Sequence, residues 1–199
     1  MHLQDLSLVK WDGNQSTERL TVPPGISLPA WIEATGPLSR VMDTRSLSEA
    51  TAEALEAEDA LVRIEASYDA TEERYLLRKL ELSAPEGREV TGTLLREVAP
   101  LRIMRWVLPR TFQPRDVGLA TPAVMRYIYP ERRIDLEPRP RGAIGPTHTE
   151  ILEVATVYRL AYIVRDAPAK AVADSLGLER RTATNWILRA RNAGLLPDG

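Results

Sequence analysis

Gly177 constrains the fold of this chain more than any other residue, because it separates two segments that both have helical periodicity. The first segment opens at Pro168, a residue suited to the first turn of a helix. The residues that recur in it at helical spacing are Ala171, Val172, Ser175 and Leu176. Glycine at the end of such a segment permits the positive φ of a tight turn. The sequence therefore predicts a helix that ends at Gly177 and a turn made by Gly177, Leu178 and Glu179.

A second helix is predicted over 180–193, just before Gly194. Its buried side is expected to hold residues at the spacing i, i+3, i+4 and i+7, which are Ala183, Trp186, Ile187 and Ala190. Trp186 is thus interpreted as a core residue. The same segment has four positive and no negative side chains, which makes it the most concentrated positive element of the chain.

A third helix is predicted to precede this pair, over 147–165. Thr147 and Glu150 have the spacing of a capping box, which satisfies free amide donors at a helix start, and His148 is interpreted as a polar residue in that first turn. The apolar residues of this helix cover more than one face and are Ile151, Leu152, Val154, Val157, Tyr158, Leu160, Tyr162, Ile163 and Val164. Two packing partners are therefore expected for it, and this surplus of apolar surface motivates the hypothesis of a homodimer.

The paired helices resemble the helix-turn-helix of bacterial and phage transcriptional regulators. The residues that carry the resemblance are Ala173, Gly177, Leu178, Ala183 and Trp186. Residues 149–196 are similar to the C-terminal modules of small DNA-binding proteins from high-GC Gram-positive bacteria and their phages. One departure is Glu179, where such proteins often have Ser or Thr. A carboxylate still stabilises a helix N-terminus, but here it would lie near phosphate.

The resemblance implies that the helix over 180–193 lies in the DNA major groove, and the chemistry of its exposed side agrees. At 100° per residue, the side opposite the apolar stripe holds Arg181, Thr184, Asn185, Leu188 and Asn192. Arginine pairs with guanine and asparagine with adenine, while Thr and Leu meet the thymine methyl group. The predicted base contacts are therefore Arg181, Thr184, Asn185 and Leu188. The predicted phosphate contacts are Arg180, Arg189, Arg191 and Lys170, which would supply position and affinity.

The first hundred residues predict a mixed domain. Val62, Ile64, Ala66 and Tyr68 alternate with polar residues, as in a strand with one buried face, and Leu76, Leu80 and Leu82 form a second such set. We expect these two strands to form a hairpin, with two short helices after it over 91–98 and 100–108. Closer to the N-terminus than this hairpin, a strand over 3–9 and a helix over 46–58 are expected.

Composition then divides the chain into three parts. We expect an α+β N-terminal domain over 1–108 for assembly or sensing, with a β-hairpin and short helices, and an all-α trihelical helix-turn-helix domain over 147–199. Between them, residues 109–146 contain seven prolines and read as an extended connector, with a short docked piece near Val124, Tyr127 and Ile128.

Residues 1–104 contain 11 basic and 18 acidic side chains, so this part is a poor candidate for contact with phosphate. Connector arginines such as Arg132, Arg133, Arg139 and Arg141 are candidates to reach a neighbouring minor groove or backbone.

Several classes of function are excluded by composition. The chain has no cysteine and two histidines, which excludes a thiolate nucleophile, a disulfide framework and the common zinc-ligand spacings. No P-loop, nucleophile elbow or dinucleotide fingerprint occurs, so we expect neither an enzyme nor a cofactor or metal. Clusters of acidic residues are interpreted as solvated surface. No membrane partner is expected, since no run of 18 apolar residues and no signal peptide are present, and a cytoplasmic location is predicted.

The principal expectation is a sequence-specific double-stranded DNA-binding protein that regulates transcription, as a homodimer that reads two half-sites about one helical turn apart. One alternative keeps DNA but makes the protein an architectural factor, such as an excisionase or the small subunit of a phage DNA-packaging enzyme. Another is a protein-interaction adaptor whose helix pair docks on a polypeptide. The simplest alternative is a helical subdomain with a solvated arginine face.

Overall fold

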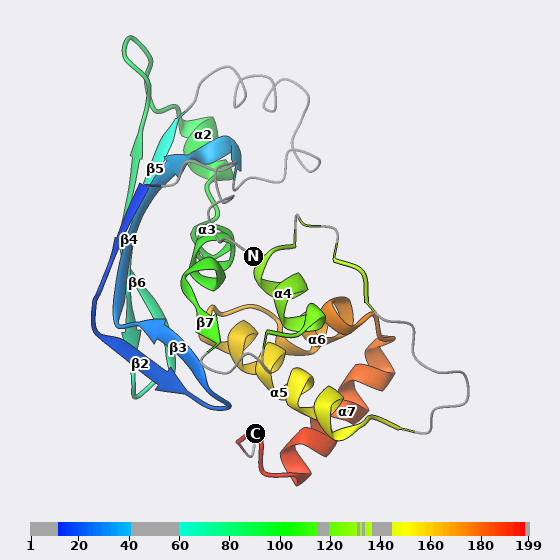
Figure 1. The fold of residues 1–199 in the computed structure, drawn as a ribbon. Helices are drawn as coiled ribbons and strands as arrows, with labels where there is room; N and C mark the ends of the chain where they lie inside the picture. The colour runs from blue at the N-terminus through cyan, green and yellow to red at the C-terminus, as the bar shows by residue number, and fades with distance from the viewer. Residues whose placement is uncertain are drawn as a thin grey trace. The chain divides into compact units, whose positions relative to one another are not determined.

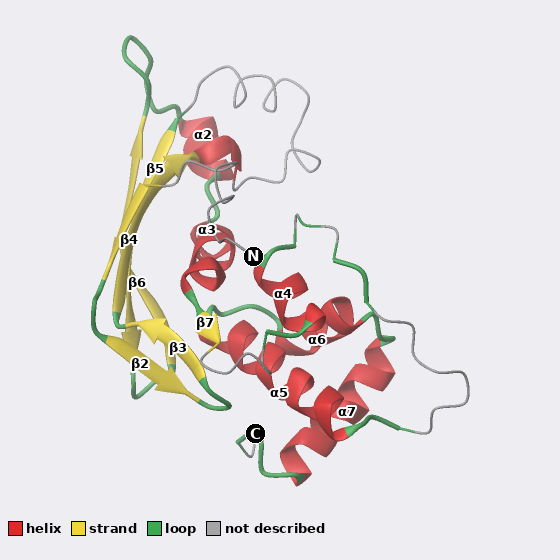
Figure 2. Ribbon diagram, in the orientation of Figure 1, coloured by secondary structure: helices red, strands yellow, loops and turns green. Residues whose placement is uncertain are grey.

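The computed structural model describes residues 12–40, 60–114, 120–130, 132, 134–136 and 145–197 (Figure 1). Antiparallel strands come first along the chain and a group of contacting helices follows, so the protein is α+β, as predicted (Figure 2). Contacts divide the chain into two compact units. The first unit contains residues 1–18 and 29–107, and the second unit contains residues 19–28 and 108–199. The elements expected over 3–9 and 46–58 lie outside the described residues.

The first unit contains a four-stranded antiparallel sheet with the order β1-β4-β5-β6. Its strands are β1 (Asp12–Gln15), β4 (Trp31–Pro37), β5 (Leu61–Asp69) and β6 (Arg74–Ser83). Because successive side chains of a strand point to opposite faces, alternate residues of β5 are buried, namely Val62, Ile64 and Ala66. The predicted hairpin is confirmed as β5 and β6, which pair along their whole length.

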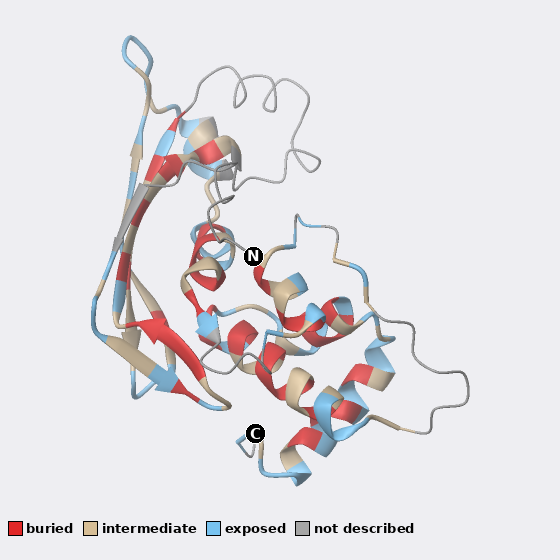
Figure 3. Ribbon diagram, in the orientation of Figure 1, coloured by how far each residue is buried: buried red, intermediate tan, exposed pale blue. Residues whose placement is uncertain are grey.

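The two faces of this sheet differ in chemistry. Two short helices follow β6 in the chain, α2 (Gly92–Glu97) and α3 (Pro100–Val107). Helix α3 contacts β6 and has a buried side (Figure 3). The buried residues of α3 are Ile103, Met104 and Val107. The residues that alternate with the buried ones form exposed or half-exposed ion pairs, some between neighbouring strands and some along one strand. They are Glu33, Arg63, Glu65, Lys79 and Glu81. This second face is therefore a solvated surface, with ion pairs that each contribute little to stability.

The second unit contains a small sheet that the sequence did not predict. Its strands are β2 (Arg19–Val22), β3 (Ile26–Pro29) and β7 (Gln113–Pro114), in the order β2-β3-β7. Arg19 holds it together: its Nε donates to Ser27 Oγ at 2.8 Å, and its Nη2 donates to the carbonyl oxygens of Ser27 and Thr111 at 3.0 Å each. Residues 19–28 thus belong with the C-terminal helices rather than with the sheet of the first unit.

The described part of the second unit also contains four α-helices: α4 (Pro122–Ile128), α5 (His148–Ile163), α6 (Pro168–Leu176) and α7 (Arg180–Asn192). The last three agree closely with the predicted helices, and the capping box of Thr147 and Glu150 is present at the start of α5. The docked piece expected within the connector is α4, which contacts both α5 and α6. No helix within the described ranges is both long and apolar enough to cross a bilayer.

Most of the apolar surface of α5 is covered by the chain itself, although Tyr162 is 38% exposed. Helix α5 contacts α4, α6 and α7. Its buried residues are Ile151, Val154, Ala155, Thr156, Val157, Leu160, Ala161 and Ile163. The expected packing partners are therefore helices of the same chain, and the surplus apolar surface that motivated the homodimer hypothesis no longer supports it.

Gly177→Ala is expected to destabilise the protein by roughly 1 to 2 kcal/mol, the usual cost of a left-handed residue that carries a Cβ. Gly177 has φ 65°, and an added Cβ would lie 3.3 Å from Cδ1 of Leu136. Gly194 is the matched control, since its φ is 71° and nothing lies within 4 Å of an added Cβ. Urea unfolding followed by circular dichroism should show a larger loss for Gly177→Ala than for Gly194→Ala. A midpoint for Gly177→Ala equal to that of the wild type would contradict the described turn.

Glu153 on α5 is expected to make stability depend on pH. Burial raises the pKa of its carboxyl above the ordinary 4.5, a hydrogen bond from the Thr121 hydroxyl opposes the rise, and the charge of Glu150 adds to it. The folded protein then binds this proton more tightly than the unfolded chain, so the free energy of unfolding falls as pH rises from about 4.5 through the raised pKa.

Glu153→Gln keeps an oxygen that accepts the Thr121 hydroxyl but has no charge. Its stability relative to wild type should therefore increase between about pH 4 and about pH 7. Urea midpoints of both proteins at the two pH values provide the comparison. If the midpoints of Glu153→Gln and wild type differ by the same amount at both pH values, the Glu153 carboxyl is not the source of the pH dependence.

Candidate DNA-binding surface

The turn between α6 and α7 depends on one left-handed residue. Gly177 ends α6 with φ 65° and ψ 36°. Its amide and the amide of Leu178 both donate to the carbonyl oxygen of Ala173, the latter at 2.9 Å. Ala173 is itself buried, and its small side chain suits a helix that packs against the next one. The chain then enters α7 at Arg180, so the turn predicted at Gly177 is present.

Helix α7 has one buried and one exposed side (Figure 3). The buried side holds Ala183, Trp186, Ile187 and Ala190, as the spacing predicts. Contacts with α5 and α6 cover it. The exposed side holds Arg181, Thr184, Asn185, Leu188 and Asn192. All four predicted base-contact residues are therefore brought together on the solvent side of one helix.

Three arginines of α7 are exposed: Arg180, Arg181 and Arg189. Arg189 packs over Gly145, where an added Cβ would lie 2.5 Å from the Nη1 atom of Arg189. This contact brings the end of the connector beside the exposed side of α7. Between residues 180 and 193 no acidic side chain offsets these charges.

Arg191 differs from the other arginines of the helix. It is half-buried, its Nη2 donates to the Tyr158 hydroxyl at 3.0 Å, and its guanidinium carbon lies 5.7 Å from the centre of the Tyr158 ring. The side chain therefore connects α7 to α5. A phosphate contact by Arg191 stays a prediction, and it would require this interaction to be broken or shared.

Lys170, the fourth predicted phosphate contact, comes from α6. It is exposed and forms an ion pair with Asp174 four residues later, with 2.7 Å between Nζ and Oδ2. Such exposed pairs are weak, so the ammonium group can exchange this partner for another anion. The structure thus places Lys170 on a different helix from the other predicted contacts.

Glu179 is the acidic residue closest in sequence to this surface. It is exposed and occupies the N-cap position of α7, where its side chain makes no capping hydrogen bond. The departure from Ser or Thr therefore removes a side-chain cap and puts a negative charge at the start of the helix. This charge would oppose binding of an anion there.

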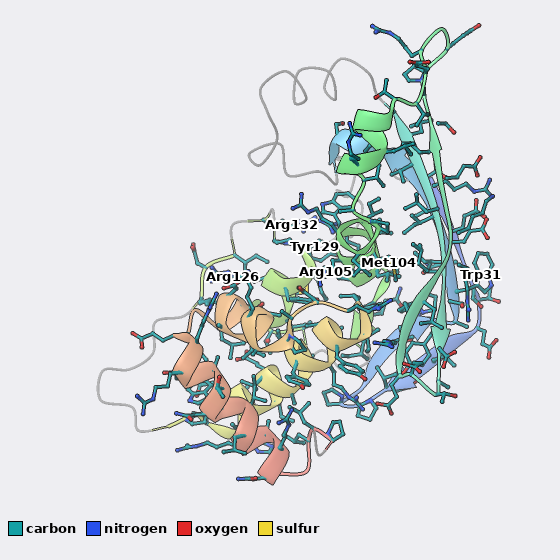
Figure 4. All side chains as sticks on the ribbon, turned by 180° about the vertical axis from the view of Figure 1, so that it is seen from behind. Trp31, Met104, Arg105, Arg126, Tyr129 and Arg132 are labelled. Atoms are coloured by element: carbon teal, nitrogen blue, oxygen red, sulfur yellow. The ribbon has the colours of Figure 1, made fainter. Side chains whose placement is uncertain are left out.

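Two further exposed arginines were only partly predicted from the sequence. Arg126 on α4 and Arg132 just after it are both exposed, and the guanidinium carbon of Arg132 lies 4.7 Å from the centre of the Tyr129 ring (Figure 4). Arg132 was among the connector arginines expected near DNA, whereas Arg126 was not. The sequence signal for Arg126 is its place in the last turn of a helix that opens with Thr121 and Pro122. Arg133, Arg139 and Arg141 lie outside the described residues.

The described residues lack a cluster of potential metal ligands. Within them, no group of three or more His, Asp or Glu side chains could hold a metal ion. His148 is exposed in the first turn of α5.

No protein-family model, no curated protein and no solved structure matches this chain. The resemblance to helix-turn-helix regulators therefore rests on the sequence of residues 149–196 alone.

Substitutions should separate the exposed side of α7 from its buried side. Arg181→Ala and Asn185→Ala are expected to weaken binding to a preferred DNA site by roughly 1 to 3 kcal/mol for each lost base contact, with unchanged urea midpoints. Trp186→Ala should instead cost roughly 3 to 5 kcal/mol of folding stability, because it truncates a large core side chain. Unfolding by Arg181→Ala would show that this arginine supports the fold.

Proposed function

We propose that the protein binds double-stranded DNA in a sequence-dependent manner and regulates transcription, with the exposed side of α7 in the major groove. The observation that carries the proposal is the composition of that side. It presents Arg181, Asn185 and Thr184, which can form hydrogen bonds with base edges, on a helix whose opposite side is buried.

The dimensions of α7 suit this role. An α-helix fits the major groove, and a helix of 13 residues is about 20 Å long, enough to cross several base pairs. In helix-turn-helix proteins the N-terminal part of the second helix contacts the bases. Arg181, Thr184 and Asn185 lie in the first half of α7, where such contacts would occur.

The charges support phosphate binding on both sides of this face. At 100° per residue, Arg180 and Arg189 lie on opposite flanks of the face that Arg181 and Asn185 occupy. Arginines placed there can meet the two phosphate backbones that border a groove. Lys170, Arg126 and Arg132 add positive charge elsewhere in the second unit. Glu179 and Asp174 act against binding through their negative charge.

One such helix reads only a few base pairs, so useful specificity favours two copies on one site. We therefore keep a homodimer in the proposal on this ground alone, and a cytoplasmic location is part of the same proposal. The competing function is an adaptor that binds a polypeptide. The observation in its favour is Leu188, which is 54% exposed on the same face.

Selection of bound duplexes from a random DNA library tests the proposal. The full-length protein should enrich a recurring sequence, and Arg181→Ala should alter that sequence. Arg102→Ala, which removes an exposed arginine from α3, is the matched control and should leave the sequence unchanged. Failure to enrich any sequence, at low salt as well, would favour the adaptor.

Salt dependence on the enriched duplex tests the phosphate contacts. Arg180→Ala and Arg189→Ala should each weaken binding to all sequences alike and reduce the slope of log K against log salt by about 1. Fluorescence anisotropy at several salt concentrations gives these slopes. An unchanged slope for either variant would remove that arginine from the proposed contacts.

A further inference from the structure

The centre of the exposed side of α7 holds an apolar strip. Leu188 is 54% exposed, and Thr184 is exposed one turn before it. The Thr184 hydroxyl donates its only proton to the carbonyl oxygen of Arg180 at 3.0 Å. Thr184 therefore offers a ligand its methyl group and an acceptor lone pair, but no donor. Residues four apart on a helix are neighbours, so this methyl group and Leu188 form one strip.

The surroundings of this strip determine what can cover it. A single exposed leucine needs no special explanation. Leu188, however, follows Arg181 and Asn185 on the same side of α7, and Arg189 lies beside it. A ligand for this face must combine negative charge at its border with a small apolar group within. The major groove of DNA does so at thymine, whose C5 methyl group lies between hydrogen-bonding base edges and the phosphates.

We propose that Leu188 and the Thr184 methyl group make α7 selective for thymine, by packing on C5 methyl groups in the major groove. This inference rests on the proposed function, because α7 must lie in that groove. Four residues of helix rise about 6 Å, close to two base-pair steps of about 3.4 Å. The two contacted thymines, on either strand, therefore lie within about two base pairs of each other.

Deoxyuridine provides the direct test, because it pairs like thymidine and lacks only the methyl group. Thymines of the duplex enriched by the full-length protein are replaced one at a time on both strands. Replacement of a contacted thymine should weaken binding about fourfold, the effect of one buried methyl group. Replacement of other thymines should leave the affinity unchanged.

Matched variants assign the effect to the two side chains. Leu188→Ala should weaken binding to the thymine duplex and abolish the difference between thymine and uracil at one position. Thr184→Val keeps the methyl group and should preserve the difference at the other position, whereas Thr184→Ser removes the methyl group and should abolish it. Leu95→Ala is the control, because Leu95 is 56% exposed on α2 of the first unit. Leu95→Ala should change neither the affinity for the thymine duplex nor the difference between thymine and uracil.

The outcomes separate this inference from the proposed function. Equal affinity for thymine and uracil at every position, with sequence-specific binding intact, overturns the inference and leaves DNA binding in place. Leu188→Ala could instead lower the affinity for the thymine and uracil duplexes equally and also lower the mass measured by light scattering. This result would show that Leu188 contacts a second copy of the chain. The absence of any DNA binding overturns both proposals.

Discussion

Burial of the apolar stripe of α7 determines which side chains the helix can offer to a ligand. Trp186 is 4% exposed and Ile187 is 6% exposed, and the helix contacts α5 and α6. Rotation of α7 by one residue, about 100°, would expose part of this stripe and bury a charged side chain without a partner, which costs several kcal/mol. The orientation of Arg181 and Asn185 toward solvent is therefore set by packing on the opposite side. Gly177 supports this arrangement, because its left-handed conformation directs the chain from α6 into α7.

The same packing makes neighbouring arginines of α7 differ in exposure and in contacts. Arg189 and Arg191 are two residues apart, yet Arg189 is exposed whereas Arg191 donates to Tyr158 of α5. A guanidinium group held on an aromatic ring adds stability, and it is then less available to a phosphate. The positive charge of α7 is thus divided between holding the helix in place and facing solvent. Arg180, Arg181 and Arg189 are the exposed part.

Local features of the structure could be predicted from sequence, because short-range periodicity and caps specify them. Helices α5, α6 and α7, the capping box at Thr147 and the hairpin of β5 and β6 are of this kind. The small sheet was missed because its strands are two to four residues long and pair Ser27 with Gln113, far apart in the chain. The periodicity of a short segment does not indicate which distant segment it pairs with.

The same limit applies to the candidate site. The 100° spacing predicts which residues of α7 are exposed, but it cannot show that Tyr158 engages Arg191 or that Gly145 lies against Arg189. It also could not show that α4 covers α5, and so the apolar surface of α5 suggested a second copy of the chain. Partners distant in sequence account for each of these differences.

Dimethyl sulfate footprinting of the enriched duplex tests most directly whether α7 reads the major groove. This reagent methylates guanine N7, which lies in the major groove. The full-length protein should protect one or more guanines, and Arg181→Ala, although folded, should lose protection at the guanine that Arg181 contacts. A bound duplex whose guanine N7 atoms all stay reactive would contradict the account.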